Sequence, residues 1–194
     1  VREQMTALER FLKYITFDTQ SEEGSEATPS TEKQRALGRV LARELAEMGL
    51  EGACLADNGA VYGWLPATPG REDVPVIALI AHMDTAPRVP GGPMKARVVS
   101  YEGGVLVLNE EKGIALSPAA FPDLLEQVGK QLVVTDGTTL LGADDKAGIA
   151  IILQAVEELL AEKAPHGKIC LGFTPDEEIG MGASFFDVSG FGAD

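Results

Sequence analysis

The sequence is poor in basic residues: 16 Lys and Arg stand against 30 Asp and Glu, which gives a net charge of -14. Without a basic stripe to displace the counterions of a phosphate backbone, we expect no nucleic-acid partner. Binding to an anionic membrane surface is disfavoured for the same reason. No apolar run approaches the ~20 residues that cross a bilayer as a helix, so we also expect no membrane protein.

Cysteine and histidine are scarce as well, with two residues of each. Cys54 and Cys170 are far apart in the sequence, and each is flanked by apolar residues. We expect two buried free thiols rather than a disulfide, which is typical of a cytoplasmic protein. Residues 1–5 show no basic start followed by an apolar stretch, so we expect no signal peptide. His166 lies in an Ala-Pro-His-Gly turn and is expected at the surface.

Hydrophobic residues, in contrast, make up 45% of the chain, which is enough for one domain with a sizeable core. Apolar residues at helical spacing predict helices over residues 6–15, 30–48 and 146–161. Thr31 and Gln34 have the spacing of a capping box at the start of the second helix.

Continuous apolar runs predict buried strands over residues 74–81 and 168–174, the first of them buried on both faces. A hairpin is predicted where residues 53–56 and 60–65 flank an Asp-Asn-Gly turn. Shorter elements are predicted as strands within residues 95–116 and over 131–135, and as a helix over 122–128. Because strands alternate with helices, we expect an α/β fold, a three-layer domain with a mostly parallel sheet.

Three acidic segments follow predicted strands or precede a predicted helix, and the first is His82-Met83-Asp84. In an extended segment His82 and Asp84 point the same way, so the carboxylate can accept a hydrogen bond from one ring nitrogen. Such a bond leaves the other nitrogen as a better metal ligand. A His-x-Asp pair also arises by chance in an acidic chain. Its place at a strand end favours a binding site, because α/β proteins bind ligands at the carboxyl ends of their strands.

The second segment, Asp144-Asp145, lies between two leucines and the apolar helix predicted from residue 146. Adjacent acids beside so much apolar surface are costly unless a cation or hydrogen-bond donors compensate them. They could be metal ligands, or an ordinary N-cap, where Asp is favoured. The two interpretations are compatible, with Asp145 near the helix start and Asp144 on a metal ion.

The third segment, Asp176-Glu177-Glu178, follows the strand predicted over residues 168–174. A solvated acidic turn is the common meaning of such a run. Its apolar neighbours make the run less ordinary, and one Glu could bind a metal ion while the other faces substrate; the spacing does not say which. Together the three segments have the ligand chemistry of a two-zinc hydrolase with a spare glutamate to move the proton.

Three longer stretches carry a resemblance to a known family: residues 81–87, 135–150 and 173–180. On these stretches the chain resembles the peptidase T family, the tripeptide aminopeptidases of the zinc aminoacylase/carboxypeptidase superfamily. The resemblance covers essentially all 194 residues. It implies a phosphorylase/hydrolase-like zinc exopeptidase core and a cytoplasmic enzyme that releases the N-terminal residue of short peptides.

The same resemblance implies a role for each matched side chain. His82 would bind one of two zinc ions, Glu178 would bind the other, and Asp144 would bridge both. Glu177 would be the general base for a water held between the ions and would pass its proton to the leaving amine. Asp84 would orient His82 from the side opposite the metal.

The resemblance further implies that residues 1–194 are the N-terminal part of the catalytic domain, an incomplete core without the lid domain and the C-terminal part. Each zinc ion would then lack one protein ligand, an Asp or a His, so we expect weak metal binding and no meaningful peptidase activity of the chain alone. A cis peptide bond is implied between Asp144 and Asp145. Two other functions stay open: a related zinc carboxypeptidase or N-acyl amino acid deacylase, and a non-catalytic chain. The sequence does not indicate an oligomeric state.

Overall fold

The computed structural model describes residues 5–92 and 94–194. The expectation of no signal peptide concerns residues 1–5, of which only residue 5 lies within these ranges. The described helices and strands follow in chain order: α1 (Ala7–Tyr14), α2 (Gln34–Glu47), β1 (Glu51–Leu55), β2 (Val61–Leu65), β3 (Ile77–His82), β4 (Arg97–Tyr101), β5 (Leu106–Asn109), β6 (Ile114–Leu116), η1 (Pro122–Gln127), β7 (Lys130–Val134), α3 (Ala143–Glu162), β8 (Ile169–Thr174), η2 (Glu177–Ile179) and α4 (Val188–Phe191).

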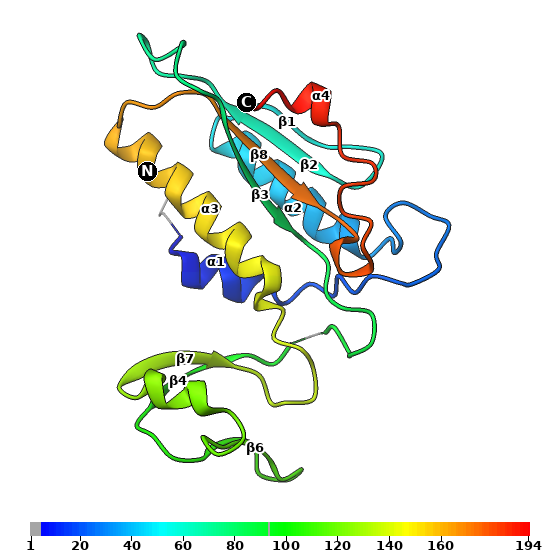
Figure 1. The fold of residues 1–194 in the computed structure, drawn as a ribbon, viewed down its shortest axis with the longest axis vertical. Helices are drawn as coiled ribbons and strands as arrows, with labels where there is room; N and C mark the ends of the chain where they lie inside the picture. Colours follow the sequence, from blue (N-terminus) through cyan, green and yellow to red (C-terminus); the bar gives the residue numbers. More distant parts are fainter. Residues whose placement is uncertain (1–4, 93) are drawn as a thin grey trace.

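The main sheet has four described strands in the order β1–β2–β8–β3 (Figure 1). A tight turn joins β1 to β2, and this predicted hairpin is antiparallel. β2 is also antiparallel to β8, whereas β8 and β3 are parallel. The α/β class is confirmed, but the expectation of a mostly parallel sheet is wrong. The sheet is mixed because the hairpin supplies two of its four strands.

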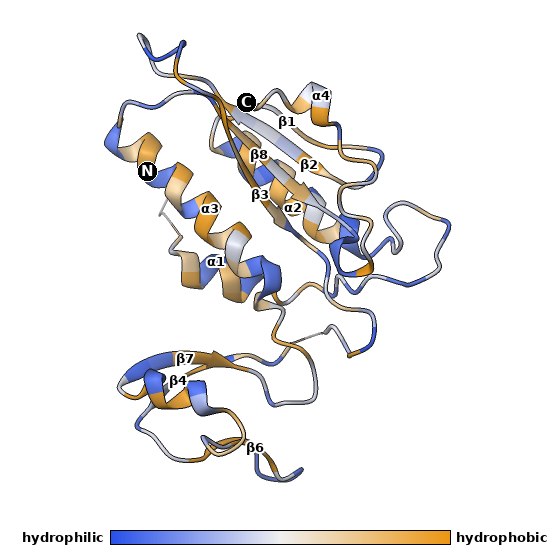
Figure 2. Ribbon diagram, viewed as in Figure 1, coloured by the Kyte–Doolittle hydropathy of each residue, from blue (hydrophilic) through white to orange (hydrophobic). Residues whose placement is uncertain are grey.

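Helices α1, α2 and α3 pack on one face of the sheet. Leu41 of α2, Ile149 of α3 and Leu171 of β8 are fully buried in a single cluster there. Figure 2 shows hydrophobic residues along much of α3, the helix that supplies Ile149 and Leu153 to this cluster. On the opposite face Tyr62 packs against the aromatic rings of Phe186 and Phe191, beside the short helix α4. The sheet therefore lies between two layers, the second of them thin.

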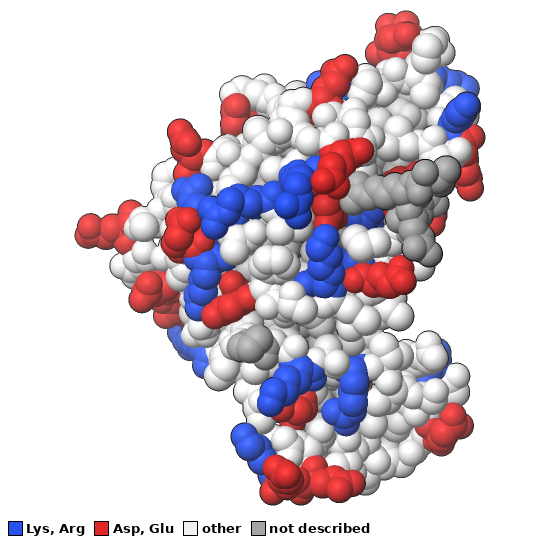
Figure 3. All heavy atoms as spheres, turned by 180° about the vertical axis from the view of Figure 1, so that it is seen from behind, with Lys and Arg blue, Asp and Glu red and all other residues white. Residues whose placement is uncertain are grey.

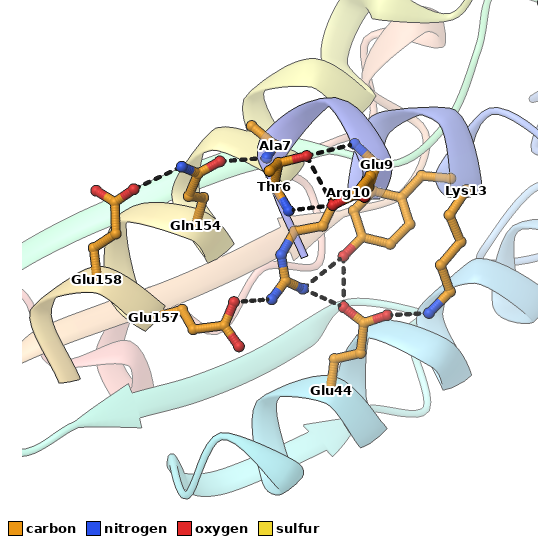
Figure 4. Close-up of polar contacts among 10 residues, drawn as sticks. Thr6, Ala7, Glu9, Arg10, Lys13, Glu44, Gln154, Glu157 and Glu158 are labelled. Carbon is orange, nitrogen blue, oxygen red and sulfur yellow. Dashed lines mark hydrogen bonds and ion pairs between the residues drawn. The ribbon is translucent and has the colours of Figure 1, made fainter. Parts of the chain in front are cut away.

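A buried ion-pair network joins the three helices on the first face (Figure 4). Arg10 of α1 donates to Glu44 of α2 at 2.8 Å and to Glu157 of α3 at 2.6 Å. Tyr14 also donates to Glu44 at 2.6 Å, and Lys13 pairs with the same carboxylate. Arg10 and Glu44 are each 1% exposed, so the centre of the network lies inside the protein.

Strand β3 is more exposed than its apolar sequence predicts. It begins at Ile77, three residues after the predicted start, and Ile77 and Ile80 are 51% and 52% exposed. The expectation of burial on both faces is wrong, because β3 is the last strand of the sheet within the described residues. The strand predicted over residues 168–174 is confirmed: all six residues of β8 are buried between β2 and β3.

Helix α2 begins at Gln34, and the predicted capping box is absent. Lys33 is the N-cap and makes no capping hydrogen bond through its side chain. The Gln34 amide contacts Asp176, and its Nε2 donates to the Thr31 hydroxyl at 3.2 Å, which is not a capping-box bond because no backbone N–H takes part. Helix α1 instead carries a capping box, between Thr6 and Glu9.

The segment between β3 and α3 forms two small antiparallel sheets, β4–β7 and β5–β6, with η1 beside them. The predicted short strands and helix of this segment are confirmed. Figure 1 shows the small sheets beyond the carboxyl end of β3 and the start of α3. They therefore lie on the side of the molecule where the acidic segments meet.

Both cysteines are free thiols, as expected, and Cys170 is buried. Cys54 is exposed on the outer strand β1, so the expectation that both thiols are buried is wrong for this one. Among the described residues, no helix is long and apolar enough to cross a membrane. On the face seen in Figure 3, basic side chains lie close to acidic ones.

Candidate metal and catalytic site

The three acidic segments converge at one end of the main sheet. β3 ends at His82, the parallel strand β8 ends beside it at Thr174, and His82 is in register with Thr174. Carboxyl ends of neighbouring parallel strands open on the same edge of a sheet. The segment 176–178 follows β8 directly, and the start of α3 brings Asp144 to the same place.

His82 is nearly buried and is held at both ring nitrogens. Nδ1 lies 3.1 Å from the backbone carbonyl of Asp84 and 3.4 Å from its carboxylate. Nε2 lies 2.9 Å from Asp144 Oδ1 and 3.8 Å from Glu177 Oε2. Burial lowers the pKa of His82, but the neighbouring carboxylates outweigh it and raise that pKa to about 9. The carboxylates around His82 thus favour the protonated, positively charged imidazole ring.

Asp144 and Asp145 lie at a break before the regular part of α3. Their backbone angles are not helical, and the peptide bond between them is cis, as the resemblance implies. Asp145 Oδ1 accepts a hydrogen bond from the Gly148 N–H at 3.1 Å, which is a capping contact at the helix start. The side chain of Asp144 is 87% exposed and faces His82. The capping use therefore falls to Asp145, whereas Asp144 is left facing His82.

Asp84 lies behind His82 and is fully buried. Its two carboxylate oxygens accept hydrogen bonds from successive backbone amides: Oδ1 from Glu177 N–H at 2.9 Å and Oδ2 from Glu178 N–H at 3.1 Å. The closest contact of the His82 ring with this residue is to the backbone carbonyl, at 3.1 Å. Asp84 thus connects the His82 segment to the acidic turn, which the sequence did not predict.

Glu177 and Glu178 begin the short turn η2, and both residues are exposed. The side chain of Glu177 is 58% exposed and approaches His82. Burial raises the pKa of Glu178; His82 opposes this shift, and the carboxylates of Asp84, Asp144 and Glu177 add to it. Both glutamates therefore belong to the same electrostatic cluster as His82 and Asp144.

Lys146 is a member of this region that sequence reasoning missed. Its side chain is fully buried, and its ammonium donates to the Phe17 carbonyl at 2.9 Å. Burial lowers the pKa of Lys146 to about 8, while Asp18 and Asp84 act in the opposite direction. A Lys directly after two acids at the start of an apolar helix is the one signal that the sequence offered.

The donor atoms fit zinc in type, since imidazole nitrogen and carboxylate oxygen are its usual ligands. The 2.9 Å between His82 Nε2 and Asp144 Oδ1 is close to the ~3.3 Å that two ligands of one tetrahedral zinc keep. Within residues 5–92 and 94–194, however, no group of three or more His, Cys, Asp or Glu side chains is placed to hold a metal ion. His166, the other histidine, lies in its turn with Nδ1 beside the Gly167 carbonyl.

Comparisons of sequence and fold show a similarity to a known class of peptidases. Residues 131–190 match the model of Peptidase family M20/M25/M40, and this stretch contains Asp144, Glu177 and Glu178. A crystal structure of aminopeptidase PepT from Bacillus cereus superposes with a TM-score of 0.65 and 26% identity, covering 96% of this chain and 40% of that one.

Within this class, the similar proteins are named peptidase T. The peptidase T of Clostridium acetobutylicum is 52% identical over 189 residues, which are 96% of this chain and 46% of that protein. The peptidase T of Desulfitobacterium hafniense strain Y51 is 54% identical over 191 residues, which are 97% of this chain and 46% of that protein. The resemblance predicted from the sequence is confirmed, and the chain spans about half the length of the curated relatives it matches.

Proposed function

We propose that this chain is the N-terminal part of the catalytic domain of a zinc aminopeptidase, and that the complete enzyme releases the N-terminal residue of tripeptides. The observation that carries the proposal is the convergence of three acidic segments at one sheet end, with His82 Nε2 2.9 Å from Asp144 Oδ1. The relatives named peptidase T support the substrate, at 52% and 54% identity.

His82, Asp144 and Glu178 would hold the metal ions in this proposal, with Asp144 shared between two of them. Bound zinc lowers the pKa of a water molecule to about 7 and polarises a peptide carbonyl. Asp144 suits the shared position because its carboxylate is exposed and stands in front of the His82 ring. The third protein ligand of each ion would come from a part of the enzyme beyond these residues.

Glu177 would act as the general base. Its carboxylate is more than half exposed beside His82, so it can reach a water molecule and a substrate nitrogen in turn. Asp84 holds the Glu177 and Glu178 amides, which fixes the backbone from which both side chains extend. Glu177 would take the proton of the attacking water and deliver it to the leaving amine.

We place the enzyme in the cytoplasm with short peptides as its partners. The two free cysteines support this compartment, since extracellular chains more often pair their thiols. The net charge of -14 argues against nucleic acid.

The assay that tests the proposal uses the protein encoded by the complete reading frame. A free tripeptide should be hydrolysed, its N-acetylated form should not, and a chelator should abolish the activity until zinc is returned. The acetylated peptide is the matched control, because an aminopeptidase needs a free N-terminus. Turnover of N-acyl amino acids with the tripeptide left intact would instead establish a deacylase.

A further inference from the structure

A buried cluster outside the predicted site holds the acidic turn from the side opposite His82. Asp176, the first residue of the turn, is 3% exposed and lies in the left-handed region with φ 60°. Its carboxylate accepts hydrogen bonds from Ser30 N–H and Gln34 Nε2, each at 2.7 Å, and from the Ser30 hydroxyl. Ser30 and Gln34 are also buried. We call these three residues the Asp176 cluster.

The cluster and Asp84 together hold three consecutive backbone amides. Asp176 N–H donates to Gln34 Oε1 at 3.2 Å. The next two amides, of Glu177 and Glu178, donate to the two oxygens of Asp84 at 2.9 Å and 3.1 Å. Each amide of the turn is thus bound by a buried side chain from a distant part of the chain. Within the part of the chain that the structure describes, no hydrogen bond of the Glu177 or Glu178 carboxylate holds the turn.

We infer that Ser30, Gln34 and Asp176 are positioning residues, which set the direction in which Glu177 and Glu178 meet the metal ions and the substrate. The effect on metal ions and substrate rests on the proposed function, whereas the claim that these residues hold the turn rests on the contacts alone. Side chains that hold metal ligands in place change metal affinity or activity by about 10- to 100-fold when they are removed. The Gln34 amide is central, because it both donates to Asp176 and accepts from it.

The positioning role differs from simple space filling in a way that a substitution can separate. Gln34→Met keeps the length and approximate volume of the side chain but removes its donor and its acceptor. Ser30→Ala removes the hydroxyl and leaves the Ser30 N–H contact in place. Glu44→Gln is the matched control, because Glu44 is likewise buried and accepts three side-chain hydrogen bonds, far from the turn.

The experiment measures amide hydrogen exchange by NMR and zinc affinity by titration, on the chain and on each variant. The exchange rates of the Glu177 and Glu178 amides are divided by the rate of the Leu171 amide in β8. A general loss of stability is thereby separated from an effect on the turn. Gln34→Met should speed exchange at both glutamates at least ~10-fold and weaken zinc binding ~10-fold, and Ser30→Ala should have a smaller effect in the same direction. Glu44→Gln should leave both quantities unchanged.

The inference would be overturned if Gln34→Met, like Glu44→Gln, left the exchange rates of Glu177 and Glu178 relative to Leu171 unchanged. An unperturbed turn with weakened zinc binding would overturn it too, because the effect would then not pass through the backbone. Failure of the proposed function is recognised separately: the wild-type chain would bind no zinc at any concentration, while the exchange measurement would still decide whether the cluster holds the turn.

Discussion

Glu177 and Glu178 are neighbours in the chain, yet their surroundings separate them. Both residues are exposed, but the Glu177 carboxylate lies 3.8 Å from the His82 ring, whereas desolvation and the neighbouring carboxylates raise the pKa of Glu178. Because a general base must reach water and substrate, the exposed position beside His82 suits Glu177. A carboxylate whose charged form is disfavoured by its surroundings is stabilised by a cation beside it, which suits Glu178 as a metal ligand.

Substituting each glutamate in the complete enzyme should give different losses. Glu177→Gln should leave zinc bound and lower kcat by at least ~100-fold, the usual scale for a lost general base. Glu178→Gln should reduce the bound zinc, because the amide oxygen is a poorer ligand than a carboxylate. Metal analysis of the purified variants together with tripeptide kinetics measures both. If Glu177→Gln lost zinc and Glu178→Gln kept it, Glu177 would be the metal ligand and Glu178 the general base.

The residues of the site were largely predictable, but their supports were not. His82, Asp144 and the acidic run at 176–178 stand out in sequence because polar groups interrupt apolar runs. Gln34 does not stand out: its partner Asp176 is 142 residues away, and the local pattern suggested a helix cap. Long-range hydrogen bonds of this kind leave no periodicity, so the sequence predicted which side chains converge and missed the contacts that hold the acidic turn.

At the scale of elements, helices and strands follow from apolar spacing, and most of their positions were predicted. Strand order was harder to predict. The apolar run before His82 resembles a central parallel strand, but β3 lies at an edge of the described sheet. The hydrophobic pattern of a strand indicates which of its side chains are suited to burial. It does not indicate which strands lie beside it in the sheet.

Arg10 offers a test of how the helices are joined behind the site. Arg10→Ala leaves the Glu44 and Glu157 carboxylates without the guanidinium that joins them (Figure 4). Breaking a buried ion pair from one side costs about 3–5 kcal/mol, so the free energy of unfolding should fall by that amount.

Urea denaturation measures the Arg10 effect against a matched control. Arg88 pairs with Glu23 at 3.1 Å on the surface, where both side chains are mostly exposed. Arg88→Ala should change the free energy of unfolding by less than about 1 kcal/mol. Equal losses in the two variants would show that the buried network does not join the helices.

At the scale of the whole molecule, the β3 edge of the sheet has no neighbouring strand within the described residues. Ile80 is 52% exposed on the edge strand β3 and lines a hollow of about 540 Å³ with Phe186 and Phe191. Edge strands with exposed apolar residues pair with other chains. The chain should therefore self-associate as its concentration rises.

Analytical ultracentrifugation over a concentration series tests this expectation. Ile80→Lys should suppress the association, because a charge on an edge strand opposes pairing. Val105→Lys is the control: Val105 is 61% exposed but lies between β4 and β5, away from the main sheet. Association that persists in Ile80→Lys, or that Val105→Lys removes equally, would show that the β3 edge is not the cause.

The central claim is that His82 and the acidic segments form a metal site that this chain holds only in part. Equilibrium dialysis of the chain against zinc tests it most directly, with His82→Ala and His166→Ala as paired variants. A catalytic zinc normally has three protein ligands, so two per ion should give a Kd above about 1 µM. We expect His82→Ala to weaken binding at least ~10-fold and His166→Ala to leave it unchanged. Two tightly bound zinc ions per wild-type chain, or equal losses in the two variants, would contradict the account.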